Sequence, residues 1–366
     1  MMKVLFVSSL SASCRTSYNF RLERLAQGLK ELGCDTDMLY LGDCRFRRPG
    51  LLQLFNLSAI LKKSKTADII HAGGTGCAYV CAVLKKTLGK PVIYDVHGDT
   101  VLENWGARRR PLDLRALGMT LQSMMMERAA QRLQDYIVCS KPLADLLRAR
   151  GVSPGRIAVI RNGADTDLFT PGAVTSGAVT SNAETGKKDR FIFGYAGGGH
   201  YYQGLNILLK AAAYIKESGV EIRVAGVAKS GPCPDNVKYY GKLEHQDIPD
   251  FIKSCDVLVI PRPCLRALYY SGPTKFAEYL AAGKPVLATD VSEISAFIQK
   301  AACGIVTKAD PEDLTGGMRK FFSLPQEELV RMGQNARKLA LEVFDLRKIS
   351  QEYLGFLKRF YDGSSV

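Results

Sequence analysis

The sequence predicts an α/β protein made of two doubly wound domains, each with a parallel sheet covered by helices. Its 366 residues fit two domains of ordinary size. Short, continuous apolar runs alternate with helical patterns along the chain, and such runs are typical of parallel strands that are buried on both faces. The runs fall into two series, separated by a stretch of small and polar residues. Each series is therefore expected to form one domain.

The first series lies within residues 1–170. A strand is predicted over residues 4–8, and a helix follows over 19–33, because leucines recur there at helical spacing and Gly33 is a typical helix stop. Further strands of this domain are expected at 68–72, 91–95, 136–140 and 157–161.

The second series begins after residues 171–188, which contain the repeat Gly-Ala-Val-Thr-Ser twice and predict an exposed linker. The second domain is predicted over residues 189–343. Its strands are expected at 191–195, 221–226, 256–261 and 284–289. The apolar pattern near the C-terminus predicts a long amphipathic helix over residues 339–361, which could pack on either domain. The part over about 344–362 is expected to pack back on the first domain.

The composition is that of a globular protein, with 46% hydrophobic, 9% aromatic and 23% charged residues. It excludes a disordered chain, a collagen-like fibre and a coiled coil. No apolar run approaches the ~20 residues that span a bilayer, and the N-terminal apolar run is too short for a signal peptide. We therefore expect a cytoplasmic protein whose ten scattered cysteines are reduced.

The charge balance indicates an anionic partner. The formal net charge is +14, and residues 1–170 carry +10 of it. Such a field attracts nucleic acid, an anionic membrane or substrates that carry phosphate. Nucleic acid is not an expected partner, because the sequence lacks RNP-like aromatic strands, G-x-x-G clamps and Cys/His knuckles. The alternative is a basic, solvated surface without a specific role.

One helix motif carries the strongest sign of chemistry. A helix is predicted from Pro273, which suits the first helical position, to Gly283, a typical stop. It follows the third strand of the second series, so Pro273 and Thr274 should lie at the carboxyl edge of the sheet, where helix N-termini attract anions. Lys275 and Glu278 share one face of this helix, where the cation suits a diphosphate and the carboxylate suits sugar hydroxyls. The alternative is a surface ion pair.

Residues 273–290, Pro-Thr-Lys-Phe-Ala-Glu-Tyr-Leu-Ala-Ala-Gly-Lys-Pro-Val-Leu-Ala-Thr-Asp, resemble the donor-site helix of retaining glycosyltransferases of the GT-B fold, family 4 (group 1) type. The resemblance covers nearly the whole chain. The other matching segments, in order, are 68–74, 91–98, 139–142, 160–169, 195–198 and 203–204. The resemblance implies two facing Rossmann-like domains with an interdomain cleft, an N-terminal acceptor domain and a C-terminal domain that binds the nucleotide sugar.

The resemblance also implies roles for single residues. His97 matches a histidine near the donor sugar and is the candidate catalytic residue; the alternative is a core histidine. Glu278 matches the carboxylate that holds the nucleotide ribose, and Lys242 with Leu243 stands where the base usually lies. The candidate donor-binding residues are Gly197, Gly198, Arg262, Arg266, Pro273, Thr274, Lys275 and Glu278.

Three positions depart from the family. Tyr270 replaces the first of two glutamates, so the task of that carboxylate is unassigned. Gly198 and Gln203 replace an arginine and a lysine at the opening of the second domain. A diphosphate in a closing cleft still needs compensating charge. Lys275 is the best candidate, and the others, which follow the preceding strand, are Arg262 and Arg266.

The basic excess of the first domain has two candidate locations. Residues 45–63 form an apolar helical stretch bracketed by cations, and Arg108, Arg109 and Arg110 form a second cluster. Both resemble elements that bind the surface of anionic membranes. A peripheral membrane contact is therefore expected; the alternative is a core helix with basic ends.

Together these observations predict a glycosyltransferase that moves a hexose from a nucleotide diphosphate sugar to a hydroxyl of a glycan or lipid-linked acceptor, with retention. No cofactor besides this substrate is expected, and no metal, since no supported Asp-x-Asp triplet occurs. The alternatives are a nucleotide-sugar epimerase of the same architecture, against which Tyr270 argues, and a catalytically inactive partner subunit.

Overall fold

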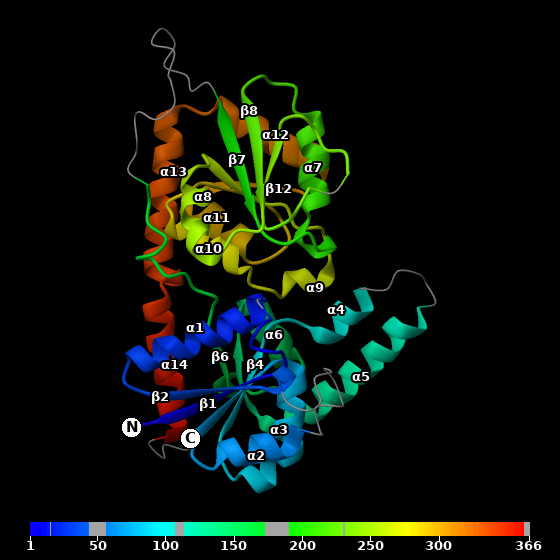
Figure 1. Cartoon of the computed structure of the whole chain (residues 1–366), viewed down its shortest axis with the longest axis vertical. Coiled ribbons are helices and arrows are strands. Elements are labelled where there is room, and N and C mark those ends of the chain that lie inside the picture. Colours follow the sequence, from blue (N-terminus) through cyan, green and yellow to red (C-terminus); the bar gives the residue numbers. More distant parts are fainter. Residues whose placement is uncertain (15, 44–55, 107–112, 173–189, 230, 362–366) are drawn as a thin grey trace. The chain divides into compact units, whose positions relative to one another are not determined.

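The computed structural model describes residues 1–14, 16–43, 56–106, 113–172, 190–229 and 231–361 (Figure 1). The chain divides into two compact units. The N-terminal unit comprises Met1–Asn162, Tyr269–Gly272 and Leu346–Val366, and the C-terminal unit comprises Gly163–Leu268 and Pro273–Asp345.

The N-terminal unit contains a six-stranded parallel sheet in the order β2-β1-β3-β4-β5-β6. Its strands are β1 (Lys3–Ser8), β2 (Asp35–Tyr40), β3 (Ile69–Gly73), β4 (Val92–Val96), β5 (Asp135–Val138) and β6 (Ile157–Val159). Its helices are α1 (Ser17–Glu31), α2 (Leu57–Ser64), α3 (Gly74–Leu88), α4 (Thr100–Gly106), α5 (Leu114–Ala130), α6 (Lys141–Ala149) and α14 (Leu346–Tyr361).

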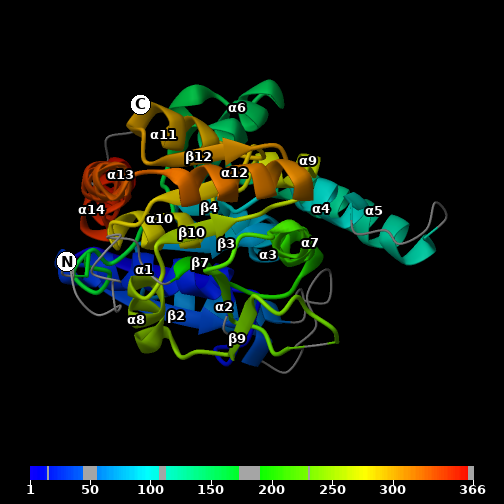
Figure 2. The ribbon, with the colours of Figure 1, turned by 90° about the horizontal axis from the view of Figure 1, so that it is seen from above.

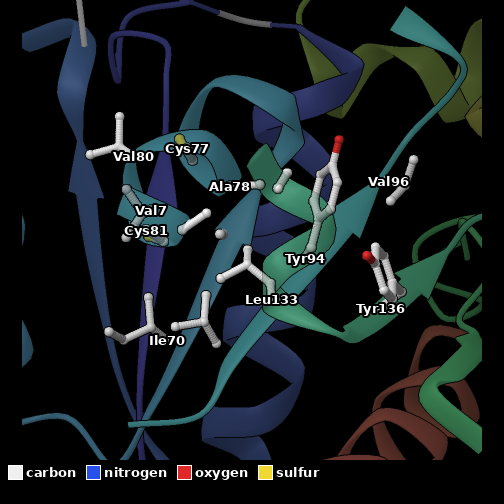
Figure 3. Close-up of a cluster of buried hydrophobic side chains, with 14 of the residues drawn as sticks. Val7, Ile70, Cys77, Ala78, Val80, Cys81, Tyr94, Val96, Leu133 and Tyr136 are labelled. Carbon is white, nitrogen blue, oxygen red and sulfur yellow. The ribbon is translucent and has the colours of Figure 1, made fainter. Parts of the chain in front are cut away.

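Helices bury both faces of this sheet, as the continuous apolar strands predict. On one face, Val7, Ile70 and Tyr94 pack against Cys77 and Cys81 of α3 (Figure 3). On the other face, apolar residues of α1 and α14 form a second cluster with the strands. Its fully buried members include Val4, Phe6, Leu22, Leu29, Ile93, Tyr353 and Leu357.

The C-terminal unit contains a second six-stranded parallel sheet, in the order β12-β11-β10-β7-β8-β9. Its strands are β7 (Phe191–Ala196), β8 (Val220–Ala225), β9 (Val237–Gly241), β10 (Val257–Ile260), β11 (Val286–Thr289) and β12 (Gly304–Thr307). Its helices are α7 (Leu205–Tyr214), α8 (Ile248–Lys253), α9 (Arg266–Tyr269, whose last residue falls in the N-terminal unit), α10 (Thr274–Ala281), α11 (Ile294–Ala301), α12 (Pro311–Ser323) and α13 (Gln326–Leu339). Helices lie over both sides of this sheet as well (Figure 2).

Local signals account for several helix ends. The Thr16 and Ser140 side chains accept hydrogen bonds from the first turns of α1 and α6. Gly33 and Gly283, both predicted as helix stops, have φ angles of 86° and 64°, a left-handed conformation that glycine adopts without strain.

The predicted C-terminal helix is interrupted. After α13 the chain forms one π-helical turn, Ala340–Phe344, and Asp345 is extended before α14 begins. The Asp345 carboxylate accepts a hydrogen bond from Thr166 Oγ1 at 2.9 Å, and the backbone N–H of Ala164 donates to Phe344 O. These bonds hold the chain at the point where it passes from the C-terminal to the N-terminal unit.

The unit boundaries differ in detail from the expected domains. The chain leaves the N-terminal unit at Asn162, eight residues before position 170. Most of the predicted linker, 171–188, lies outside the described residues, as do Arg108, Arg109, Arg110 and residues 45–55 of the first basic stretch. The described part of that stretch includes α2. Ile60 is buried and Leu57 and Leu61 pack on the core, so α2 fits the alternative of a core helix with basic ends.

None of the described helices combines the length and apolarity needed to cross a membrane.

Candidate active site

The end of β7 and the start of α10 bring several predicted donor-binding residues together. Lys275 Nζ lies 4.3 Å from the centre of the Tyr195 ring, a cation–π distance. A Cβ atom on Gly197 would lie only 2.3 Å from the same Nζ, so Gly197 leaves the space that the ammonium group occupies. We call Tyr195, Gly197, Arg262, Lys275 and Glu278 the donor cluster.

Hydrogen bonds fix α10 against the end of β7. The backbone N–H of Ala196 donates to Tyr279 Oη at 2.9 Å, and Tyr195 Oη donates to Gly198 O at 2.7 Å. Tyr279 is fully buried and lies one turn beyond Lys275 on α10. The position of Lys275 beside Gly197 is therefore set by buried contacts.

The charges of the donor cluster act on Lys275. Burial and, to a smaller extent, the Arg262 guanidinium lower the pKa of Lys275, Glu278 partly opposes them, and the net result is a pKa of about 7. Arg262 is itself buried, and Thr289 Oγ1 donates a hydrogen bond to its carbonyl at 2.7 Å. Two cationic side chains thus lie near one carboxylate, and an anionic ligand would relieve the unfavourable placement of Lys275.

The remaining candidate residues also follow strands of this sheet, but fewer contacts fix their positions. Pro273 is the N-cap of α10 and Thr274 its first residue, and no described side chain caps this helix. Lys242 is exposed and Leu243 is partly buried, directly after β9. Arg266 is exposed at the first residue of α9 and is not one of the described charges that act on Lys275.

Tyr270 has an apolar environment in the N-terminal unit. Its side chain packs against the cluster that covers the α3 face of the sheet, and Ser140 Oγ donates to its carbonyl oxygen at 2.6 Å. Asn162 Nδ2 donates to Gly272 O at 2.6 Å, which holds the same short segment. The residue in the slot of the first family glutamate therefore acts as a packing residue.

The second cluster of polar residues surrounds Asp95, at the carboxyl end of β4. Arg21 Nε lies 3.0 Å from Asp95 Oδ2, and Arg21 Nη2 donates to Oδ1 at 3.1 Å. His71 Nε2 lies 3.2 Å from the same Oδ2, while His71 Nδ1 lies 2.6 Å from Tyr353 Oη. Arg21, His71, Asp95, His97 and Tyr353 form what we call the Asp95 cluster.

Burial and charge together set the protonation of this cluster. Burial alone would raise the pKa of Asp95, but Arg21 and then His97 outweigh it and hold that pKa well below its usual range. Burial lowers the pKa of His71, only partly offset by Asp95. The arrangement is therefore a buried Arg21–Asp95 ion pair with a neutral His71 beside it.

His97 lies at the exposed side of the Asp95 cluster. Its side chain is 23% exposed, its Nε2 is 3.1 Å from Asp95 Oδ2 without hydrogen-bond alignment, and its ring is 4.6 Å from the Tyr18 ring. Cys139 Sγ donates to the His97 carbonyl oxygen at 3.3 Å. Unlike the fully buried His71, His97 keeps part of its ring exposed.

Sequence reasoning singled out His97 but missed the residues that surround it. One signal was present: Asp95 ends a continuous apolar strand, and a carboxylate in a doubly covered strand needs a buried partner. Its partners Arg21 and His71 are distant in sequence, and so is Tyr353, which bonds to His71. Among the described residues, no group of three or more His, Cys, Asp or Glu could hold a metal ion.

Comparison with known proteins agrees with this geometry. The chain has two Rossmann-like units, and in one of them the N-terminus of a helix at the sheet edge is suited to bind an anion. This architecture is that of the GT-B class. Residues 20–168 match the family model described as Glycosyltransferase Family 4, and residues 180–339 match the model described as Glycosyl transferases group 1. The chain belongs to the group 1 glycosyltransferases of the GT-B fold.

Two curated relatives are distant. The MMP alpha-(1->4)-mannosyltransferase of Mycolicibacterium hassiacum is 26% identical over 305 residues, which cover 78% of this chain and 69% of the relative. The UDP-Gal:alpha-D-GlcNAc-diphosphoundecaprenol alpha-1,3-galactosyltransferase of Escherichia coli is 22% identical over 310 residues, covering 81% and 76%.

Solved structures share the fold. Sucrose-phosphate synthase from Thermosynechococcus elongatus matches with a TM-score of 0.79 at 18% identity, covering 100% of both chains. Anabaena HepE in complex with UDP-glucose matches with a TM-score of 0.71 at 17% identity, covering 98% of this chain and 100% of that one. At these identities the likeness concerns the architecture.

Proposed function

We propose that this chain transfers a hexose from a nucleoside diphosphate sugar to an acceptor hydroxyl, with retention and without a metal ion. The donor cluster carries the proposal, because Lys275, Arg262 and the start of α10 provide positive potential at the sheet edge where open α/β proteins bind ligands. Both curated relatives named above are hexosyltransferases, and HepE binds UDP-glucose.

In this proposal the donor occupies the C-terminal unit. The diphosphate accepts charge-assisted hydrogen bonds from Lys275 and Arg262 and lies against the backbone of Gly197, where the absence of a Cβ permits close approach. Glu278 holds the ribose, and the segment of Lys242 and Leu243 contacts the base.

The reaction proceeds on one face of the sugar. The bond between the anomeric carbon and the diphosphate oxygen breaks, the acceptor oxygen bonds to that carbon from the same side, and its proton passes to the departing diphosphate. The protein positions both substrates and stabilises the negative charge on the leaving group. His97 contacts the donor sugar, and the Asp95 cluster keeps its ring in place.

A release assay tests the proposal. The protein is incubated with UDP-, GDP- and ADP-hexoses, with and without lipid-linked and glycan acceptors, and the nucleoside diphosphate released is measured. Release that depends on one donor and one acceptor, with an α-linked product from an α-linked donor, is expected. No release with any pair, or an epimerised nucleotide sugar, would contradict the proposal. A protein that binds donor without turnover would instead be an inactive partner subunit.

A further inference from the structure

Helix α5 presents an apolar face to solvent. Its exposed large hydrophobic residues, with exposed fractions between 42% and 79%, are Leu114, Leu117, Met119, Leu121, Met124 and Met125. Leu114, Leu117, Leu121 and Met125 recur every three or four residues and therefore form a continuous stripe along the helix. Scattered apolar side chains are normal on a surface, but a continuous stripe marks an interaction site.

The opposite side of α5 fixes this orientation. Ala116, Thr120, Ser123, Met126 and Ala130 are buried. The Asn104 side chain of α4 donates a hydrogen bond to Ser123 Oγ at 2.7 Å. Figures 1 and 2 show α4 and α5 extending together away from the sheet of the N-terminal unit, so the stripe is presented by a supported pair of helices.

The charged side chains of α5 indicate the charge of the partner that the stripe can bind. Arg115 and Arg128 are exposed, one near each end of the helix. Glu127, the one acidic residue of α5, turns inward and accepts hydrogen bonds from Tyr94 and Thr75, each at 2.7 Å. The exposed charges of α5 are thus cationic. We call the stripe residues Leu114, Leu117, Leu121 and Met125, with Met124 beside them and the cations Arg115 and Arg128, the α5 face.

We propose that the α5 face docks on the surface of an anionic lipid bilayer. An apolar stripe with cations at its ends matches the boundary between acyl chains and negatively charged headgroups. Residues 1–170, which include α5, carry most of the formal net charge of +14. A second copy of the chain fits less well, because pairing two α5 faces in either direction brings like charges of Arg115 and Arg128 together.

In sequence, the α5 face is also close to His97. Its supporting helix α4 begins at Thr100, three residues after His97, at the carboxyl end of β4. A docked bilayer would therefore meet the N-terminal unit on the side of the sheet where His97 lies, which suits an acceptor with a lipid anchor. The docking itself does not depend on the proposed transfer reaction.

Vesicle co-sedimentation tests the proposal. The wild-type protein should partition onto vesicles of phosphatidylglycerol mixed with phosphatidylcholine, and much less onto pure phosphatidylcholine. Raising the salt concentration should release it, because salt screens the attraction. Arg115→Gln and Arg128→Gln should each lower partitioning about fivefold, the loss expected for one cation near the surface. The double variant Leu117→Gln/Leu121→Gln should lower it further.

Matched controls lie in the C-terminal unit. Lys300→Gln removes an exposed cation from α11, and Leu341→Gln removes an apolar side chain that is 37% exposed. Neither should change partitioning. Melting temperature and calorimetric donor binding should match the wild type in all variants, which separates docking from the transfer function.

The tryptophan gives a readout without any substitution. Trp105 is the chain's only tryptophan, lies on α4 and is 41% exposed. Its emission should shift to the blue when mixed vesicles are added. The proposal is overturned by equal binding to neutral vesicles, by unchanged binding of the α5 variants, or by a wild-type dimer that Leu117→Gln/Leu121→Gln dissociates.

Discussion

The Nζ atom of Lys275 fills the space that any side chain on Gly197 would need. A Cβ on Gly197 would come within 2.3 Å of this Nζ and 3.1 Å of Tyr195 Oη. Gly197, directly after β7, therefore leaves room for the Lys275 ammonium group of α10. The same missing side chain would also let a ligand approach the backbone.

Gly197→Ala should therefore weaken binding of a nucleoside diphosphate. The φ angle of Gly197 lies outside the left-handed region, so alanine fits the backbone, and the added methyl group displaces the flexible end of Lys275. We expect a loss of roughly 1 kcal/mol or more, the order of a single hydrogen bond to a charged group, with little change in melting temperature. Isothermal titration calorimetry measures the affinity.

Gly316→Ala is the control for this change. Gly316 lies on α12, which carries none of the candidate donor-binding residues, and a Cβ on it would meet no neighbour within 4 Å. This variant should bind nearly as well as the wild type. Equal losses in the two variants would mean that the displacement of Lys275 does not matter.

Lys275→Ala should discriminate between ligands. If Lys275 holds the diphosphate, its loss should weaken nucleoside diphosphate binding by roughly 1.5–3 kcal/mol and nucleoside monophosphate binding by less. Glu278→Ala should weaken both ligands alike, because both carry the ribose. Lys300→Ala removes an exposed lysine elsewhere in the C-terminal unit and should change neither affinity. Unchanged diphosphate binding by Lys275→Ala would place the phosphate site elsewhere.

The strands that the sequence revealed are mostly central strands, and the exception is β6, an edge strand whose Ile157–Val159 run is apolar. Sequence reasoning missed β2, β9 and β12, and all three are edge strands of their sheets. Their residues are mostly partly buried or exposed, as in Asp35–Tyr40, where Asp35 and Asp37 pair with lysines on the surface. These three edge strands lack a long continuous apolar run, so their patterns resemble those of loops.

The donor cluster could be predicted in part from the sequence, whereas the Asp95 cluster could not. Lys275 and Glu278 belong to one helix whose start and stop residues are local signals, so both the helix and its place at the sheet edge could be predicted. The Asp95 cluster joins residues from α1, β3, β4 and α14, and no local pattern brings Arg21 next to Asp95. Such contacts depend on strand order and helix packing, which the chain pattern alone does not determine.

Variants of Asp95 and His97 should have opposite effects. Asp95→Asn leaves the Arg21 charge buried without a counter-charge, which should lower the free energy of unfolding by about 3–5 kcal/mol. His97→Ala removes a partly exposed ring at the edge of the cluster and should change stability little, while turnover falls at least tenfold. Thermal melting and donor turnover measure the two effects. A large fall in melting temperature for His97→Ala, with unchanged turnover per folded molecule, would identify His97 as a core histidine.

Donor binding should depend on pH through Lys275. In the unliganded protein, burial, Arg262 and Glu278 together leave the Lys275 pKa at about 7. A bound diphosphate adds negative charge beside the ammonium group and raises this pKa. The complex therefore binds more protons than the free protein at pH values above 7, so affinity should be highest below pH 7 and should fall as the pH rises.

Calorimetry with a nucleotide sugar tests this dependence, because the esterified diphosphate of the sugar does not titrate near neutral pH, whereas a terminal phosphate does. At about pH 8, wild-type protein should take up nearly one proton on binding, seen as a difference between buffers with different ionisation enthalpies. Lys275→Arg keeps its charge at every pH and should bind with a flat profile. Lys275→Met should also be flat, at an affinity no higher than that of the wild type above pH 8. If the wild type shows no proton uptake and no decline of affinity across this range, Lys275 does not change protonation on binding.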